Sequence, residues 1–405
     1  MPQPCNEPTP DQERHPALEI LARRLDELRR QGLERRLVSI GPANGPYVTV
    51  RGRRLLLMAS NDYLGLSRHP RLTAAAARAA QELGSGTGAS RLVSGSQDGH
   101  LELEAAVARH KGTEAALVLA TGYMTNLAAV AGLAGPGDLV VSDELNHASI
   151  IDACRLSRAE VKVYPHRDAA QARHLLAQGG GDRLKLLVSD GVFSMDGDLA
   201  PLPELWRAAR QEGALLIVDD AHATGVYGAT GRGSLEHFGM EPHPGLVLVG
   251  TFSKALGCQG GFVAGAREVI STLVHRARSL LYTTAPPPAQ VAACRESLEV
   301  MREEGWRRKR LWELCAHFRR GLQEMGLTVL SEQGPIIPLL VGDAGRAWEL
   351  AQALRRQGVF APAMRPPTVP AGTSRIRFTV SAAHRPEDLD LALAALGRAL
   401  GEVAP

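Results

Sequence analysis

Short apolar segments alternate with amphipathic helical segments along the middle of the chain, from about residue 70 to residue 288. The apolar segments have the length of strands and largely lack a polar face, which is typical of strands buried on both sides of a sheet. They are Ala116–Ala120, Leu139–Ser142, Val161–Tyr164, Lys185–Ser189, Ala214–Asp219, Leu246–Gly250 and Gly261–Ala264. This alternation predicts an α/β fold in which helices cover both faces of a mostly parallel, seven-stranded sheet.

The two ends of the chain follow a different pattern. His15–Gly32 has the apolar spacing of an amphipathic helix, and Tyr47–Met58 alternates like a β-hairpin. We expect residues 1–60 to pack with a smaller α+β domain of residues 289–405, beside a large domain of residues 61–288. The predicted elements of the C-terminal part are a helical stretch from Pro286 to about Gly326, strands at Leu327–Leu330, Ile336–Val341 and Arg375–Val380, and helices at Arg346–Gln357 and Pro386–Leu400.

Composition narrows the class of protein. With 44% apolar and 22% charged residues, the 405-residue chain resembles an ordinary soluble protein. No apolar run has the length of a membrane span and no secretion signal is recognisable, so we expect a cytoplasmic protein. A net charge of +3 is too small to indicate nucleic-acid binding, and the basic run Arg307–Arg310 is interpreted as a solvated helix face. The five scattered cysteines are expected to be free thiols.

Chemically useful residues follow two neighbouring predicted strands. Asp219 and His222 lie at and just after the end of one strand, and Lys254 comes shortly after the next. Ligands of open α/β sheets bind at such strand ends. A buried carboxylate needs a cationic partner, such as a protonated pyridine nitrogen, and a desolvated lysine becomes nucleophilic. Taken singly, Asp219 could also cap a helix, and Lys254 could be an ordinary surface residue. However, the chain has only five lysines, and the placement of Lys254 one strand after Asp219 and His222 favours a functional site.

Other strand ends supply further candidates. Gly122, in a strand-to-helix turn, would let backbone N–H groups meet a phosphate, although such turns also need glycine for steric reasons. His147 could stack on a planar ring and Ser194 could donate to a ring oxygen, while both also fit turn or capping roles. Arg377 could bind a carboxylate through two parallel hydrogen bonds, or could simply be an exposed strand residue. The glycine-rich segment Gly84–Gly88 follows a helical stretch, which excludes a dinucleotide-binding loop.

Taken together, these segments resemble the α-oxoamine synthases, a family of fold-type-I pyridoxal-phosphate enzymes. The resemblance extends over nearly the whole chain, from Asn61 to His384. Arg365–Thr373 and the downstream Ala382–His384 are most similar to the members that make 8-amino-7-oxononanoate in biotin biosynthesis. The resemblance implies the PLP-dependent transferase fold type I, pyridoxal 5'-phosphate as cofactor and a homodimer.

The resemblance also implies a role for each candidate residue. Lys254 matches the lysine that forms the Schiff base with the cofactor, Asp219 would pair with the pyridinium nitrogen, and His147 would stack on the ring. The catalytic residues would then be Lys254, His147, Asp219 and His222. The remaining cofactor contacts would come from Gly122, Tyr123, Ser194 and Thr251. The expected substrate contacts are Arg35, His147, Thr368 and Arg377.

The implied reaction is a condensation of L-alanine with pimeloyl-CoA or pimeloyl-ACP with loss of carbon dioxide. Three alternatives remain open at this point. One is a sister activity, such as glycine C-acetyltransferase or another α-oxoamine synthase. The others are a non-catalytic binder of pyridoxal phosphate and a nicotinamide-dependent dehydrogenase.

Overall fold

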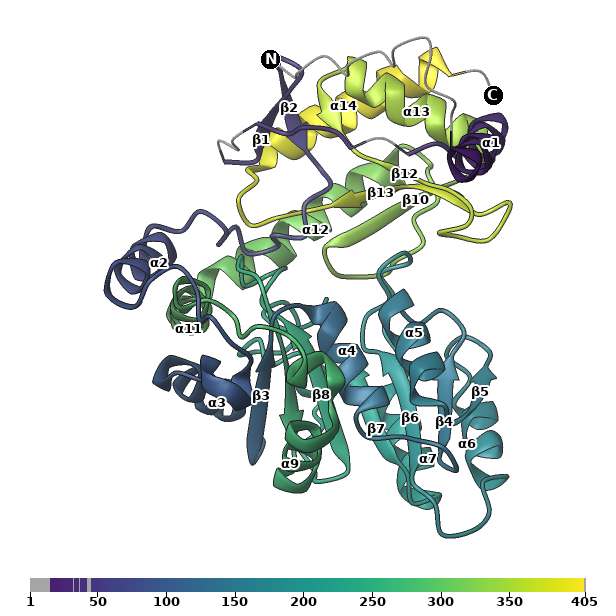
Figure 1. The fold of residues 1–405 in the computed structure, drawn as a ribbon. Coiled ribbons are helices and arrows are strands. Elements are labelled where there is room, and N and C mark those ends of the chain that lie inside the picture. Colours follow the sequence, from purple (N-terminus) through teal and green to yellow (C-terminus); the bar gives the residue numbers. More distant parts are fainter. Residues whose placement is uncertain (1–14, 32, 36, 42–44, 404–405) are drawn as a thin grey trace.

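A computed structural model describes residues 15–31, 33–35, 37–41 and 45–403 of the protein. Figure 1 shows one body built around a large sheet and a second body of two small sheets with helices, with the long helix α12 (Trp306–Glu324) extending between them. The predicted helix at His15–Gly32 corresponds to α1 (Pro16–Arg30), which buries none of its side chains.

The large sheet has seven strands in the order β3-β9-β8-β7-β6-β4-β5. Only β9 runs antiparallel to its neighbours, so the prediction of a mostly parallel sheet is confirmed. Each predicted strand agrees with the structure to within one residue at either end. The strands are β3 (Ala115–Leu119), β4 (Leu139–Asp143), β5 (Glu160–Tyr164), β6 (Lys185–Asp190), β7 (Leu215–Asp219), β8 (Leu246–Thr251) and β9 (Gly261–Gly265).

Helices cover both faces of this sheet, which explains why most of its strands are apolar on both sides, although the edge strand β5 is largely exposed. In β6, Leu186 and Val188 pack in one buried cluster while Leu187 packs in the other. Burying a side chain of this size stabilises the fold by about 1.5–3 kcal/mol. The first cluster includes α4 (Gly122–Ala131), α5 (Ala148–Ser157), α9 (Arg267–Arg276) and α10 (Arg278–Leu281). The second includes α2 (Pro70–Leu83), α3 (Asp98–Lys111), α6 (Ala169–Ala177), α7 (Leu202–Gln211), α8 (Ser234–His237), α11 (Pro288–Glu303) and α12.

The second body joins both ends of the chain. The hairpin β1 (Tyr47–Val50) and β2 (Arg53–Leu57) forms one small sheet with β11 (Val359–Phe360), which runs parallel to β2. The other small sheet has the order β10-β13-β12, with β10 (Ile336–Gly342), β12 (Ala363–Met364) and β13 (Ser374–Thr379). Helices α13 (Ala344–Arg356) and α14 (Pro386–Glu402) pack beside them. The exact domain limits stay a prediction.

One prediction for the C-terminal part is wrong. Leu327–Leu330 forms no strand, because only Val329 makes an isolated bridge, to Leu339. The predicted helical stretch after Pro286 is confirmed as two successive helices, because α11 ends at Glu303 and α12 begins at Trp306. A short π-helix at Arg91–Gly95 was not predicted.

The basic run at the start of α12 is not a solvated face. Three of its four side chains are half-buried, and only Lys309 is exposed. Each of the three donates a hydrogen bond to a backbone carbonyl of another segment, namely Arg307 to Leu64, Arg308 to Ala229 and Arg310 to His384. Because guanidinium groups can satisfy distant carbonyls while their stems pack on apolar surface, this run fastens α12 to the rest of the fold.

The described cysteines, Cys154, Cys258, Cys294 and Cys315, are free thiols. Within the described ranges no cluster of side chains is arranged to hold a metal ion. Of the helices in those same ranges, none combines the length and the apolar character needed to cross a membrane.

Candidate active site

A pocket of about 240 Å³ lies at the carboxyl ends of the central strands of the large sheet. Asp190 ends β6 and Asp219 ends β7, and the register of the two strands pairs these residues directly. Thr251 ends the next strand, β8, and Lys254 follows three residues later. The pocket is lined by Thr121, Gly122, Tyr123, Asn126, His147, Ser149, Asp190, Ser194, Asp219, Ala221, His222, Val249, Gly250, Thr251, Ser253 and Lys254.

Lys254 places its amine in the lining of this pocket. Its Nζ lies 2.8 Å from Nε2 of His222. Burial lowers the pKa of Lys254 to about 8, although the negative charges of Asp219 and Asp190 partly oppose this effect. Near neutral pH the amine is therefore deprotonated far more often than an exposed lysine, which makes it a competent nucleophile and base.

The loop that carries Lys254 is packed tightly against the N-terminal part of the large body. Gly257 has a φ of +65°, and a Cβ at this position would lie 2.3 Å from the backbone nitrogen of Ser67. Only glycine fits such a left-handed, crowded position without strain. The loop is closed by hydrogen bonds from Thr251 Oγ1 and from the backbone nitrogen of Phe252 to the carbonyl of Gly260. These contacts fix the direction in which Lys254 leaves the strand.

Asp219 is held in place by hydrogen bonds to both of its carboxylate oxygens. Asn126 Nδ2 donates to Oδ2 at 2.6 Å, and the backbone nitrogen of Ala221 donates to Oδ1 at 2.9 Å. Burial and the nearby charge of Asp219 raise the pKa of Asp190 well above its usual range. With both oxygens held by hydrogen bonds, the carboxyl group of Asp219 lines the pocket in a fixed orientation, where it can meet a cationic ring nitrogen.

His147 stands at the N-cap of α5 with its ring over the same pocket. Its backbone nitrogen donates to Asp190 at 2.8 Å, and its Nδ1 lies 2.7 Å from Ser149 Oγ. Burial lowers the pKa of His147, with Asp219 opposing and Lys254 reinforcing the effect. A neutral imidazole anchored at Nδ1, on a backbone that is itself held by Asp190, is suited to stack on a planar ligand.

The opposite end of the pocket has the features of a phosphate site. Gly122 is the first residue of α4, where backbone N–H groups are free of helical partners and point outward. A Cβ on Gly122 would lie 3.2 Å from Oγ1 of Thr251, so any larger residue would crowd the space between the helix end and this hydroxyl. The hydroxyl of Ser253 lies 2.6 Å from that of Thr251. The pocket therefore combines an amine, a carboxylate, a ring that can stack on a planar ligand and an anion-binding site at the N-terminus of α4. This combination fits pyridoxal phosphate.

The structure brings most of the predicted residues together. The residues that line the pocket are Gly122, Tyr123, His147, Ser194, Asp219, His222, Thr251 and Lys254. Tyr123 presents its ring edge toward His147, at 6.5 Å between centroids, and donates its hydroxyl to Asp152.

The three other predicted residues lie outside the lining. Arg377 is buried, and its Nε donates to the carbonyl of Ser194 at 2.6 Å, so its guanidinium borders the site. Arg35 and Thr368 are exposed. Their expected roles in substrate binding stay predictions.

Several residues of the site were not found from the sequence. Asn126 and Asp190 were missed, although Asp190 directly follows the predicted strand Lys185–Ser189, at the same edge of the sheet as Asp219. Tyr63 was missed because it precedes the alternating region, yet its hydroxyl lies 2.7 Å from Nδ1 of His222. Only the three-dimensional fold brings Tyr63 to this place.

Lys111 has a buried partner that the sequence did not indicate. Its Nζ donates to Asp220 Oδ2 at 3.1 Å and to Thr224 Oγ1 at 2.9 Å. Both charged side chains are fully buried. Asp220 therefore forms its ion pair with Lys111, away from the pocket. Of the two neighbouring acids, Asp219 is the one that lines the pocket.

Comparison with known proteins agrees with this geometry. Residues 53–396 match the sequence profile of the family described as Aminotransferase class I and II. The chain belongs to this aminotransferase family. Among its members, a protein of Stutzerimonas stutzeri (strain A1501) named 8-amino-7-oxononanoate synthase is 49% identical over 376 residues, covering 93% of this chain and 95% of its own. The predicted resemblance to the α-oxoamine synthases is thereby confirmed.

Several solved structures share the fold of this chain. A serine palmitoyltransferase variant from S. paucimobilis, with a bound PLP–myriocin aldimine, is 32% identical with a TM-score of 0.89, covering 97% of this chain and all of its own. The 8-amino-7-oxononanoate synthase of Francisella tularensis is 26% identical with a TM-score of 0.74, covering 86% of this chain and 98% of its own. The prediction of fold type I is therefore confirmed.

Proposed function

We propose that this protein condenses L-alanine with a pimeloyl thioester to give 8-amino-7-oxononanoate, carbon dioxide and the free thiol carrier, as a step of biotin biosynthesis. The proposed type of reaction is supported by one observation: Lys254, Asp219 and His147 line one pocket, beside the anion-binding N-terminus of α4. The choice of alanine and a pimeloyl group is supported by the 49% identity to a protein named for that product.

We infer that the cofactor is pyridoxal 5'-phosphate. Bound here, it would supply an electron sink for a carbanion at the α-carbon of the amino acid. Asp219 would bind the ring nitrogen as a cation, and His147 would cover one face of the ring. The N-terminus of α4 and Thr251 would bind the phosphate, while Ser194 and His222 would stand near the ring's phenolic oxygen.

Lys254 would have two tasks. Its amine would hold the cofactor's aldehyde carbon until the amino acid takes its place. The released amine, with its pKa lowered to about 8, would then remove the α-proton and return a proton at the end of the reaction. Its neighbour His222, 2.8 Å away, would keep the amine directed into the pocket between these steps.

Arg377 would orient the amino acid through its carboxylate. Its Nε is already fixed by the carbonyl of Ser194, so the remaining N–H groups of the guanidinium have a defined direction. A carboxylate held by such a fork would not rotate freely, so Arg377 would fix the orientation of the bonds at the α-carbon of the amino acid. Arg35 and Thr368 would contact other substrate groups.

Two further features belong to this proposal. The carrier of the pimeloyl group would be coenzyme A or acyl carrier protein. Two copies of the chain would form a homodimer, which is supported by exposed apolar side chains close together in sequence, Leu92, Val93 and Leu101. Light scattering on the purified protein would measure the mass of the assembly, and a monomer would contradict the dimer.

The proposed reaction is tested by mass spectrometry of the products. The purified protein with pyridoxal phosphate is given L-alanine, glycine or L-serine, each combined with pimeloyl-CoA, pimeloyl-ACP or acetyl-CoA. We expect 8-amino-7-oxononanoate with L-alanine and at least one pimeloyl carrier, at a kcat/KM well above every other combination. Preferred turnover of glycine with acetyl-CoA would instead identify a glycine C-acetyltransferase.

A further inference from the structure

A chain of polar contacts runs behind the pocket from Lys254 to the interior of the protein. Lys254 Nζ lies 2.8 Å from His222 Nε2, and His222 Nδ1 lies 2.7 Å from the hydroxyl of Tyr63. The Tyr63 hydroxyl donates to Asn61 Oδ1 at 3.1 Å, and Arg377 approaches the same oxygen at 3.5 Å. The imidazole is therefore held at both nitrogens, on one side by the reactive amine and on the other by a phenol.

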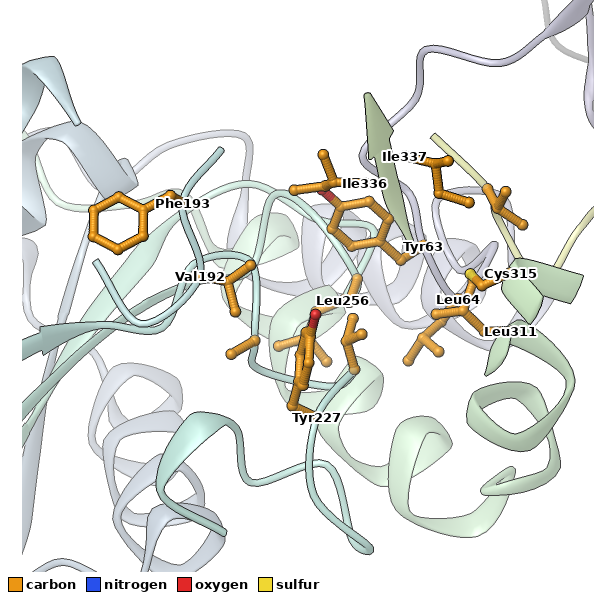
Figure 2. Packing of buried hydrophobic residues seen from close by; sticks show 14 of the residues in the cluster. Tyr63, Leu64, Val192, Phe193, Tyr227, Leu256, Leu311, Cys315, Ile336 and Ile337 are labelled. Carbon is orange, nitrogen blue, oxygen red and sulfur yellow. The ribbon is translucent and has the colours of Figure 1, made fainter. Parts of the chain in front are cut away.

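Tyr63 has no freedom to turn away from this contact. Its side chain is fully buried, and Figure 2 shows its ring packed in the cluster that also contains Leu64, Ile336 and Ile337. Burial raises the pKa of Tyr63 to about 12, while the charge of Arg377 opposes the effect. The phenol therefore stays protonated at all pH values at which the enzyme can work, and it can both donate and accept a hydrogen bond.

This two-way capacity matters because His222 can carry its single proton on either nitrogen. Burial and the charge of Lys254 lower its pKa well below the usual value, so the ring is neutral. When Nε2 accepts from the lysine, Nδ1–H can donate to the Tyr63 oxygen. When Nε2 carries the proton, the Tyr63 hydroxyl can turn and donate to Nδ1. A phenol can therefore form a hydrogen bond with both tautomers of the ring. A group that can only donate, or only accept, would pair with one tautomer alone.

We propose that Tyr63 is a positioning residue that keeps the His222 ring directed at Lys254 and at the group bound there in both tautomers of the ring. It acts through His222 and touches neither substrate nor cofactor itself. The inference rests on the proposed function only in that Lys254 is the reactive amine.

The other fully buried tyrosines supply a matched control. Tyr227 also packs in the cluster of Figure 2, and its hydroxyl has no hydrogen-bond partner among the described residues. Replacing Tyr227 by phenylalanine removes the same atom from the same core without touching the polar chain. Any general effect of losing a buried hydroxyl would appear equally in Tyr227→Phe and Tyr63→Phe.

The experiment is a pH titration of the absorbance of the protein with bound pyridoxal phosphate, followed by steady-state kinetics. For Tyr63→Phe we expect the midpoint of the titration to shift by roughly half a pH unit or more, because the ring loses its anchor. We also expect kcat to fall by about tenfold while KM for the amino acid stays within about twofold. Tyr227→Phe should match the wild type in both measurements. An unshifted midpoint in Tyr63→Phe, or a loss confined to KM, would overturn the inference.

A double-mutant cycle with His222→Ala tests the route of the effect. If Tyr63 acts through His222, adding Tyr63→Phe to His222→Ala should change neither the midpoint nor kcat further. Additive losses in the cycle would overturn the inference even if the single variant were poorly folded. The absorbance titration needs no acyl substrate, so an inactive protein that still binds the cofactor would refute the proposed substrates and leave this inference measurable. A chain that bound no cofactor would overturn both.

Discussion

Nε2 of His166 lies 2.9 Å from Oδ2 of Asp198, the residue at the end of the segment that carries Ser194 into the pocket. The other ring nitrogen of His166 lies 3.0 Å from Asp143, at the end of β4. The ring also packs edge-on against Phe193, 4.4 Å between centroids. A histidine held between two carboxylates thus ties the loop at Ser194 to the edge of the sheet, outside the residues that line the pocket.

His166 should make stability depend on pH in the alkaline range. Burial alone would lower its pKa, but Asp143 and Asp198 outweigh burial and raise the pKa to about 9. The charged ring therefore stabilises the fold fully below its unfolded pKa of about 6.5, and this contribution is lost as the pH rises through about 9. His166→Gln should lower the melting temperature by roughly 2–4 °C at pH 6 and much less at pH 10.

Thermal unfolding of both proteins at several pH values measures this difference. The control is His275→Gln, which changes an exposed histidine at the end of α9. Its melting temperature should follow that of the wild type throughout. An equal loss for His166→Gln at pH 6 and pH 10 would show that packing, and not the charge of the ring, is what the residue contributes.

Lys254→Ala should remove both turnover and the covalent link to the cofactor. Among the residues that the structure describes, no other lysine lines the pocket, so no second lysine amine is in place to substitute for it. Borohydride reduction of the protein with bound pyridoxal phosphate, followed by peptide mass spectrometry, should find the label on Lys254 in the wild type and nowhere in the variant. The exposed Lys309→Ala variant should keep full labelling and activity. Turnover by Lys254→Ala at the wild-type rate would exclude the proposed role.

The large sheet could be predicted from the sequence because most of its strands are buried on both faces and therefore mainly apolar, although the edge strand β5 is largely exposed. The strand β6 illustrates this, since Leu186, Leu187 and Val188 pack alternately on the two faces. In contrast, Leu327–Leu330 is apolar without forming a strand, because a short apolar run does not determine whether a neighbouring strand is available to pair with it. The position of Asp219 and Lys254 at or just after the ends of neighbouring parallel strands also predicted that both would lie in one pocket.

Contacts between segments distant in sequence could not be predicted in this way. The hydroxyl of Tyr63 reaches His222 across 159 residues, and Arg377 reaches Ser194 across 183 residues. Nothing in the local pattern around Tyr63 indicates which buried polar group it will meet. The orienting partners of a site are therefore harder to predict than its reactive groups, which stand at recognisable strand ends.

The buried pair of Lys111 and Asp220 should make removal of one partner costly. Lys111→Met would leave the Asp220 carboxylate buried without its cation, which costs about 3–5 kcal/mol in the free energy of unfolding. The double variant Lys111→Met with Asp220→Asn removes the charge as well and should recover a good part of that loss. Urea unfolding measures both values. A single variant as stable as the wild type would show that the pair contributes nothing net.

Asp219→Asn should separate binding of the cofactor from its activation. The amide is the same size and can keep the hydrogen bond from Ala221, but it carries no negative charge to stabilise a cationic ring nitrogen. Cofactor affinity should therefore remain measurable, while exchange of the α-proton of L-alanine with deuterated water should slow by about 10²-fold or more. Asn126→Ala removes the donor at 2.6 Å from Asp219 and keeps the charge, so its exchange rate should fall much less. Exchange at the wild-type rate in Asp219→Asn would remove this acid from the mechanism, since the ring nitrogen would then need no anionic partner.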